Sequence, residues 1–97
     1  MSVLGIHNEL IRLTDDVARD PARAGSIYNL AALLENSMHD WENHYPRDPW
    51  LARHIYGLEC MYARIPTTTG HLDARRISHW LSAKYRSTRY GAKRCAR

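Results

Sequence analysis

Apolar residues recur at alternating steps of three and four along most of this chain, and this spacing constrains its fold more than any other feature. The first segment carries the pattern at Val3, Ile6, Leu10, Leu13 and Val17. An α-helix turns once in about 3.6 residues, so residues spaced in this way lie on one face, which the helix then buries. The spacing therefore predicts an amphipathic helix of about five turns at the start of the chain.

Two Asp-Pro pairs mark where further helices begin. In Asp20-Pro21 and Asp48-Pro49 the aspartate can cap a helix, and the proline can take the first helical position, where its missing N–H costs no hydrogen bond. Gly25 lowers helix propensity, so the second helix is expected to have an irregular first turn or to start at Ser26. Pro46 ends it. The third helix is expected from about 49 to 65, forming an antiparallel hairpin with the second.

These two helices carry the most extensive apolar stripes. The stripe of the third helix is Leu51, Ile55, Leu58, Tyr62 and Ile65. The stripe of the second helix is Ala24, Ile27, Ala31, Leu34, Met38, Trp41 and Tyr45. Further apolar residues, Leu30, Ala32 and Leu33, lie on its other sides. The second helix is therefore expected to contact more than one neighbour and to form the centre of the fold.

A fourth helix is expected from about 71 to 90, with Thr69 or Asp73 near its start and Gly91 as its stop. Its apolar side comprises Ala74, Ile77, Trp80, Leu81, Tyr85 and Thr88. The opposite side carries a narrow polar stripe of Arg75, His79, Ser82, Arg86 and Arg89. This helix is therefore expected to dock by a thin apolar face and to present a basic one.

Together the segments predict an all-α fold. We expect one compact four-helix domain over residues 1–91, with the second and third helices as a central antiparallel hairpin and a basic C-terminal helix. Residues 92–97 are expected to form a basic, flexible tail. A chain of 97 residues is long enough to bury one core and too short for a second domain.

Membrane and cysteine signals are sparse. No stretch approaches the roughly 20 apolar residues that span a bilayer, and the first residues lack the pattern of a signal peptide, so a cytoplasmic location is expected. Cys60 lies in an apolar helical pattern and Cys95 in the basic tail, with no metal-binding spacing around either. We therefore expect a small buried side chain at Cys60, an exposed thiol at Cys95 and no structural disulfide.

Charge is distributed unevenly along the chain. Residues 1–74 contain all ten acidic and six basic residues, whereas residues 75–97 contain eight basic residues and no acidic one. Such asymmetry indicates an anionic partner for the C-terminal part, either an acidic protein or a nucleic acid. The candidate binding residues are Arg75, Arg76, His79, Arg86, Arg89, Lys93 and Arg94. In a nucleic-acid complex, Tyr85 and Tyr90 would stack on unpaired bases.

Histidine spacing suggests a metal or haem site as a further alternative. Glu35, His39 and Glu42 share one face of the second helix, and His44 lies on an adjacent face. His54 could approach from the third helix. The candidate ligands are therefore His39, His44 and His54. No HExxH or paired ExxH motif is present, however, and carboxylate and imidazole groups with this spacing more often form pairs on a helix surface, which is the preferred interpretation.

Aromatic residues gather in sequence near the turn of the hairpin. The cluster comprises Trp41, Tyr45, Trp50, Tyr56 and Tyr62. It would suit a small-molecule or haem pocket. The chain has no Phe, however, so tryptophan and tyrosine must supply the aromatic bulk of the core. Core packing is therefore the preferred interpretation.

The sequence favours an interaction module over an enzyme. It contains no nucleophile elbow, no glycine-rich phosphate loop and no local catalytic signature, so neither catalysis nor a cofactor is expected. Three helices carry heptad-spaced apolar stripes, which together provide more apolar surface than one small bundle needs to bury. This surplus favours self-association as a homodimer. The basic helix would dock on an acidic partner, either a second copy or another protein. A nucleic-acid-binding protein is the main alternative, and a metal- or haem-binding protein is the third.

Overall fold

The computed structural model describes residues 2–93 and 95, with the backbone alone at 23 and 24. Four α-helices follow one another: α1 (Val3–Arg19), α2 (Tyr28–His44), α3 (Pro49–Ala63) and α4 (Thr68–Lys84). A 3₁₀ helix, η1 (Pro21–Ser26), joins α1 to α2. The described residues contain no strand, so the predicted all-α fold with four helices is confirmed.

Side-chain caps start three of the helices. Ser2 accepts a hydrogen bond from the Gly5 amide at α1, and Asp48 accepts one from the Trp50 amide at α3, with Pro49 at the first helical position. The Asp-Pro signal of the third helix is thereby confirmed. At α4 the cap is Thr67, because its hydroxyl accepts a bond from the Gly70 amide, so α4 begins earlier than the sequence suggested.

The start of α2 is irregular, as Gly25 indicated. The chain from Pro21 to Ser26 is a 3₁₀ helix, and α2 begins only at Tyr28, with Ile27 at the cap position and no side-chain cap bond. The first Asp-Pro pair therefore starts a 3₁₀ helix in place of the expected α-helix. Without a capping side chain, the packing of its buried face has to hold the first turn of α2 in place.

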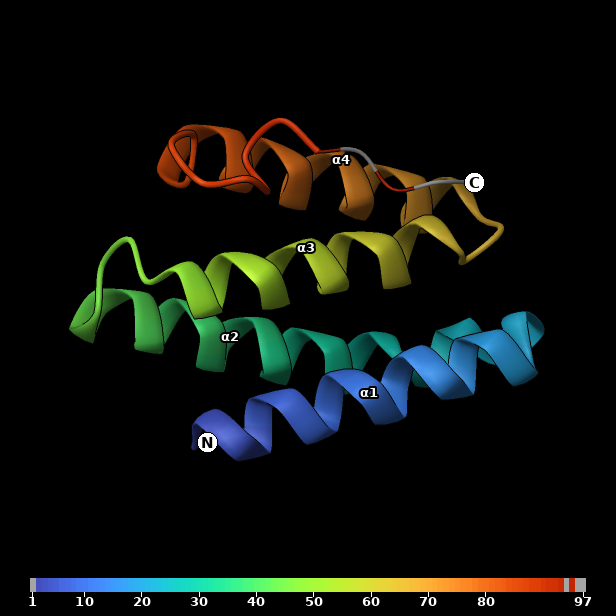
Figure 1. Cartoon of the computed structure of the whole chain (residues 1–97). Helices are drawn as coiled ribbons and strands as arrows, with labels where there is room; N and C mark the ends of the chain where they lie inside the picture. The colour runs from blue at the N-terminus through green and yellow to red at the C-terminus, as the bar shows by residue number, and fades with distance from the viewer. Residues whose placement is uncertain (1, 94, 96–97) are drawn as a thin grey trace.

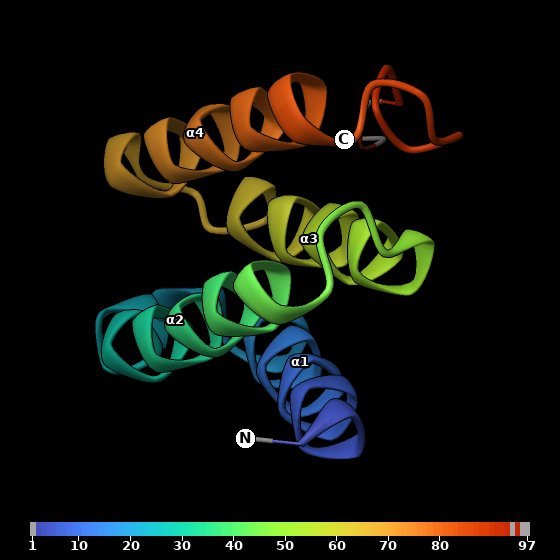
Figure 2. The ribbon, with the colours of Figure 1, turned by 90° about the vertical axis from the view of Figure 1, so that its left-hand side faces the viewer.

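Successive helices alternate in direction, and α3 lies at the centre of the stack. It packs on α1, α2 and α4, with α4 above it and α1 and α2 below it in Figure 1 and Figure 2. The prediction that the second helix forms the centre is wrong. Apolar residues on α3 outside its predicted stripe, such as Ala52 and Met61, are also buried, so α3 can be covered on more than one side.

The predicted apolar stripes form the core. All five stripe residues of the third helix are buried, and so are the stripe residues of α1 except Val3, which is partly exposed. In α2, Ile27, Ala31, Leu34 and Met38 are buried, whereas Trp41 is only partly so. Tyr45 is 55% exposed because α2 ends at His44 and the chain turns away there.

The fourth helix is shorter than expected. It ends at Lys84, so Arg86 and Arg89 lie in the turns that follow and do not extend the helical stripe. Tyr85 leaves the helix, and the chain folds back until the Gly91 carbonyl accepts a hydrogen bond from Ser82. A Cβ at Gly91 would lie 2.5 Å from the Tyr85 carbonyl oxygen. Gly91 therefore permits this close return, and it does not serve as a helix stop.

None of the helices in the described part of the chain is both long and apolar enough to cross a membrane.

Candidate interaction surfaces

The acidic face of α2 is a docking strip for α4. Glu35 forms an ion pair with Arg76, whose second nitrogen donates to the other carboxylate oxygen at 2.9 Å. Asp73 reinforces the same guanidinium. The Glu35 carboxylate is the main cause of the raised pKa of Arg76. One predicted binding residue, Arg76, is therefore engaged within the molecule.

The strip continues toward the C-terminal end of α2. The His39 ring stacks on the Trp80 indole with centroids 3.9 Å apart. Glu42 accepts hydrogen bonds from Trp80 Nε1 at 2.9 Å and from the Tyr85 hydroxyl at 2.8 Å. Burial, followed by this carboxylate, raises the pKa of Tyr85. The regular spacing of Glu35, His39 and Glu42 thus serves contacts between helices.

The three candidate metal ligands do not converge. His39 faces α4, and His44 Nδ1 bonds to the carbonyl of Asp40 in its own helix. His54 lies 2.9 Å from His7 of α1. Among the described residues there is no group of three or more His, Cys, Asp or Glu side chains that could hold a metal ion.

His54 is a buried link between α1 and α3. Its Nδ1 lies 2.8 Å from the Trp50 carbonyl oxygen, which can only accept, so Nδ1 carries the proton. Nε2 then accepts from His7 Nδ1 at 2.9 Å. Burial lowers the pKa of His54, and the nearby His7 and Arg53 lower it further. Burial therefore favours the neutral form of this imidazole.

The predicted aromatic cluster divides into three groups. Trp41 packs on Tyr45 and Trp50. Tyr62 stacks with Tyr28, and burial raises its pKa to about 12. Tyr56 packs on Tyr90 of the C-terminal segment. These rings join pairs of segments and do not surround one common pocket.

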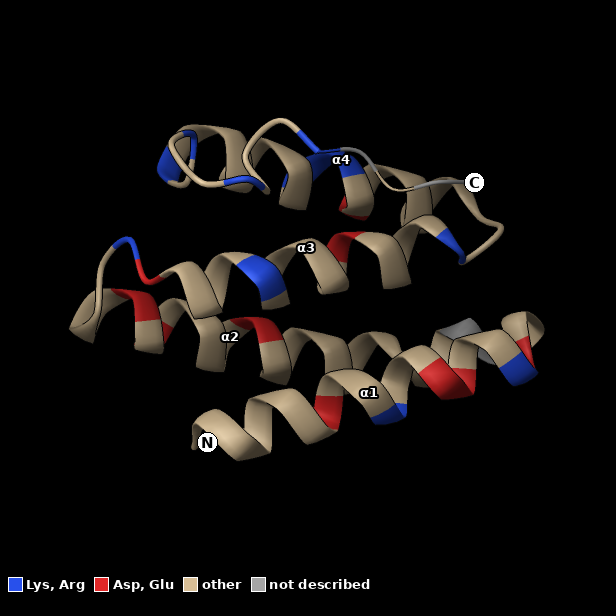
Figure 3. Ribbon diagram, in the orientation of Figure 1, with Lys and Arg blue, Asp and Glu red and all other residues tan. Residues whose placement is uncertain are grey.

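The predicted basic surface is only partly a helix face. Figure 3 shows basic residues on α4 and along the segment after it, and also on α1 and α3, while acidic residues lie on all four helices. Arg75, His79, Arg86 and Arg89 are exposed. Arg94 lies outside the described residues. The prediction that Tyr85 stacks on bases is wrong, because its ring is buried and its hydroxyl bonds to Glu42.

The C-terminal segment is attached to α3 by a disulfide. Cys60 and Cys95 are bonded, with Cα atoms 5.3 Å apart, so the predictions of no structural disulfide and an exposed Cys95 thiol are wrong. Two cysteines 35 residues apart with no motif around them give no sequence signal of pairing. They meet because the chain folds back after α4.

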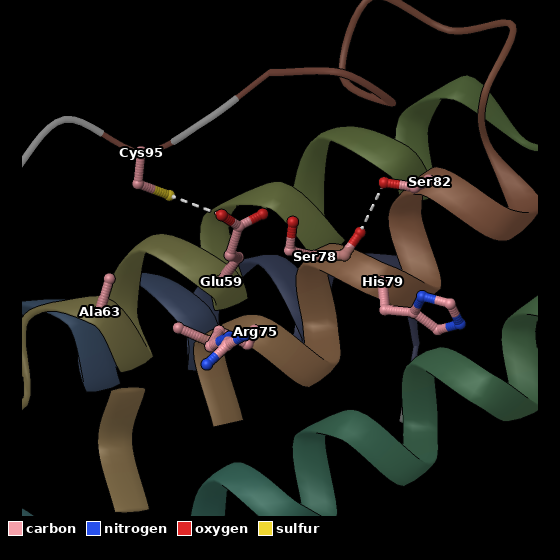
Figure 4. Close-up of a pocket in the computed structure, with 8 residues that line it drawn as sticks. Glu59, Ala63, Arg75, Ser78, His79, Ser82 and Cys95 are labelled. Carbon is pink, nitrogen blue, oxygen red and sulfur yellow. Dashed lines mark hydrogen bonds between the residues drawn. The ribbon is translucent and has the colours of Figure 1, made fainter. Parts of the chain in front are cut away.

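A polar pocket of about 390 Å³ lies between α3 and α4 beside this attachment (Figure 4). Its lining residues are Glu59, Ala63, Ala74, Arg75, Ser78, His79, Ser82 and Cys95. Cys95 Sγ lies 3.6 Å from Glu59 Oε2, a contact drawn dashed in Figure 4. An oxidised sulfur has no proton to donate, so this is a packing contact. The pocket thus borders the point where the C-terminal segment is fastened.

An apolar groove runs along the junction of α1 and α3, and we refer to it as the α1/α3 groove. Its larger section has a volume of about 570 Å³ and its smaller section about 320 Å³. Both sections share Leu10, Ile11, Tyr56 and Gly57, so they form one continuous depression. At the floor of the groove Gly57 permits the close approach of α1 to α3, because a Cβ there would lie 2.9 Å from the Leu10 side chain.

The rim of the α1/α3 groove is mainly basic. Arg64 lines the larger section, and Arg53 and Lys93 line the smaller one. Lys93 Nζ lies 5.1 Å from the Tyr56 ring centre and 5.5 Å from that of Tyr90. On the α1 side, Asp15 is already paired with Arg19. The groove therefore combines an apolar centre with positive charge at both ends.

Comparisons of the chain with protein-family models, with curated proteins and with solved structures gave no match. Assignment of a function therefore rests on the surfaces described above.

Sequence reasoning missed the α1/α3 groove. The available signal was on the third helix, where Arg53, Gly57, Cys60 and Arg64 stand at positions i, i+4, i+7 and i+11. Such spacing places two small residues between two basic ones along one side of a helix. The apolar stripes on the core faces are the stronger pattern, so the spacing of small and basic residues was not recognised.

Proposed function

We propose that this chain is a non-enzymatic, helical protein-interaction module whose docking site is the α1/α3 groove. The observation that supports the proposal is the continuous apolar depression shared by Leu10, Ile11, Tyr56 and Gly57. Ile11 is 55% exposed at its edge. An apolar groove between two helices is the kind of surface that accepts the apolar face of a partner helix.

The residues that suggested a metal site or a dimer seam are engaged in contacts within the molecule. Of the residues that suggested a metal site, Glu35, His39 and Glu42 connect α2 to α4. The heptad stripes that suggested a dimer seam are buried inside one chain, so any self-association would need the remaining exposed apolar residues, such as Leu4 and Ile11. Of these two residues, Ile11 lines the α1/α3 groove.

The nucleic-acid alternative has less support. Arg86 and Arg89 are exposed and would attract phosphates. However, Tyr85 is buried, and Tyr90 is contacted by Arg89, Lys93 and Tyr56, so neither of the two tyrosines expected to stack on bases has a freely exposed ring. Backbone attraction alone would give binding that is lost as salt rises.

We propose a cytoplasmic location for the chain. Disulfides are uncommon in that compartment and are often reversible there. Reduction of the Cys60–Cys95 bond there, with two electrons and two protons supplied by a cellular dithiol, would free Cys95 from α3, and the groove-lining residues Tyr90 and Lys93 lie close to Cys95 in sequence.

The test uses a neutral amphipathic peptide with one leucine stripe and glutamine on its polar face, about four turns long and fluorescently labelled. Binding is followed by fluorescence anisotropy with the oxidised chain. Ile11→Asn should weaken binding by about tenfold, since it removes apolar area from the groove edge. Leu33→Asn is the matched control, because Leu33 is 59% exposed on α2, away from the groove.

The outcomes separate the possibilities. Binding that Ile11→Asn weakens and Leu33→Asn does not would support the groove as the docking site. Equal effects of the two substitutions, or absence of binding, would overturn the proposal. Light scattering on the same samples reports the oligomeric state, and a dimer that only Ile11→Asn dissociates would show that the groove takes a second copy.

A further inference from the structure

We infer that the natural occupant of the α1/α3 groove is an acidic amphipathic helix of another protein, about three turns long, whose carboxylates pair with Arg53 and Arg64. This inference rests on the proposed function and adds the chemistry of the partner to it.

The length of the occupant follows from α3. Arg53 and Arg64 are eleven residues apart, which is about three helical turns and about 16 Å along the axis. They therefore project from the same side of α3. Between them on that side lie Gly57 and the disulfide-bonded Cys60, and both line the depression. A partner helix of similar length can reach both arginines at once.

The charge of the occupant follows from the rim. Arg53 and Arg64 are exposed, and neither forms an ion pair with an acidic residue of the described chain. Lys93 adds a third positive charge at the Arg53 end. Asp15 does not offset them, because Arg19 neutralises it. An acidic partner would be attracted to such a rim, and a basic one would be repelled.

The conformation of the occupant follows from the all-helical surroundings. The described residues contain no strand, so they offer no sheet edge to which an extended peptide could add. The floor is formed by the junction of α1 and α3, where side chains of a third helix can fit between the existing ridges. Leu10 and Tyr56 supply the apolar contact there.

The experiment compares three labelled peptides with the same leucine stripe and either glutamate, glutamine or lysine on the flanking positions. We expect the glutamate peptide to bind the oxidised chain about tenfold more tightly than the glutamine peptide at low salt, and the lysine peptide to bind least. The double variant Arg53→Glu, Arg64→Glu should remove the preference for glutamate. The control is Arg75→Glu, Arg86→Glu, which changes the net charge equally on exposed residues outside the groove.

Each result bears on a separate claim. Loss of the glutamate preference in the Arg53/Arg64 variant alone supports the inference. Equal binding of the glutamate and glutamine peptides overturns it while leaving the docking groove intact. A preference lost only in the Arg75/Arg86 variant would move the acidic partner to α4 and overturn it as well. Failure of all three peptides to bind would remove the proposed function itself. Circular dichroism confirms that each variant is folded.

Discussion

Arg76 of α4 reaches Glu35 of α2 across 41 residues of sequence and contacts both oxygens of its carboxylate. The backbones of α2 and α4 do not pack against each other among the described residues, since α3 supplies the direct contact to both. Long polar and aromatic side chains therefore complete the attachment of α4. The acidic residues of α2 therefore serve to attach α4. The described residues contain no cluster that could hold a metal ion.

Loss of the Arg76 ion pair should weaken the fold measurably. Arg76→Ala leaves the largely buried Glu35 carboxylate without its partner, and we expect a loss of about 1 kcal/mol because the arginine itself is half exposed. The melting temperature should fall by about 4–8 °C. Arg12→Ala is the control, because Arg12 is equally exposed but pairs only within α1. A smaller shift for Arg76→Ala than for Arg12→Ala would contradict the docking role.

Glu42 should matter more than its place on the surface of α2 suggests. Glu42→Ala removes the acceptor for Trp80 Nε1 and for the buried Tyr85 hydroxyl, and the loss should be about 1–3 kcal/mol in chemical unfolding. Glu42→Gln keeps one acceptor oxygen and should lose less. If alanine and glutamine variants are equally stable, these two hydrogen bonds do not hold α4.

Acid should destabilise the protein through His54. Its pKa is lowered in the folded state by burial, so the folded protein binds fewer protons than the unfolded chain below about pH 6.5. Above that pH the free energy of unfolding should not depend on His54. As the pH drops toward the folded-state pKa, the free energy of unfolding should fall by up to about 1.4 kcal/mol per pH unit. The groups facing His54 are His7 of α1, Arg53 and Asp48.

Urea unfolding between pH 7.5 and 5 checks this expectation. The His54→Gln variant cannot titrate at this position and should show a flatter profile, whereas His71→Gln, at an exposed position on α4, should keep the original one. Profiles of the same slope in both variants would assign the acid sensitivity to another group.

Reduction should release the C-terminal segment. The Cys60–Cys95 bond closes a loop of 35 residues, so its loss should cost at most about 4 kcal/mol in unfolding experiments. Trypsin should then cleave after Arg89 and Lys93 faster, because the segment opens locally more often. Cys95→Ser should behave like the reduced protein and should not respond to a thiol reductant. Unchanged cleavage in both cases would show that Tyr56 and Glu59 contacts alone hold the segment.

The sequence by itself determined the helices and their buried faces. Local signals carry that information: the stripe of Leu51, Ile55 and Leu58 repeats with the helical period, and the Asp48-Pro49 pair caps the next helix through neighbouring atoms. Such signals act over a few residues, so they can be recognised without knowledge of the rest of the chain. The early end of α4 was missed, and Tyr85, which follows its last residue, bonds to Glu42, a partner that no local pattern indicates.

Only the tertiary structure decided what the remaining residues contact. The position of α3 at the centre, the pairing of Cys60 with Cys95 and the junction of Leu10 with Gly57 all join residues far apart in sequence. No local pattern specifies such pairs, because they depend on how whole helices are placed. The acidic and histidine residues of α2 show the same limit, since a spacing that suits metal ligands also suits contact with another helix. The position of α4 beside this face of α2 decided that these residues form contacts between helices.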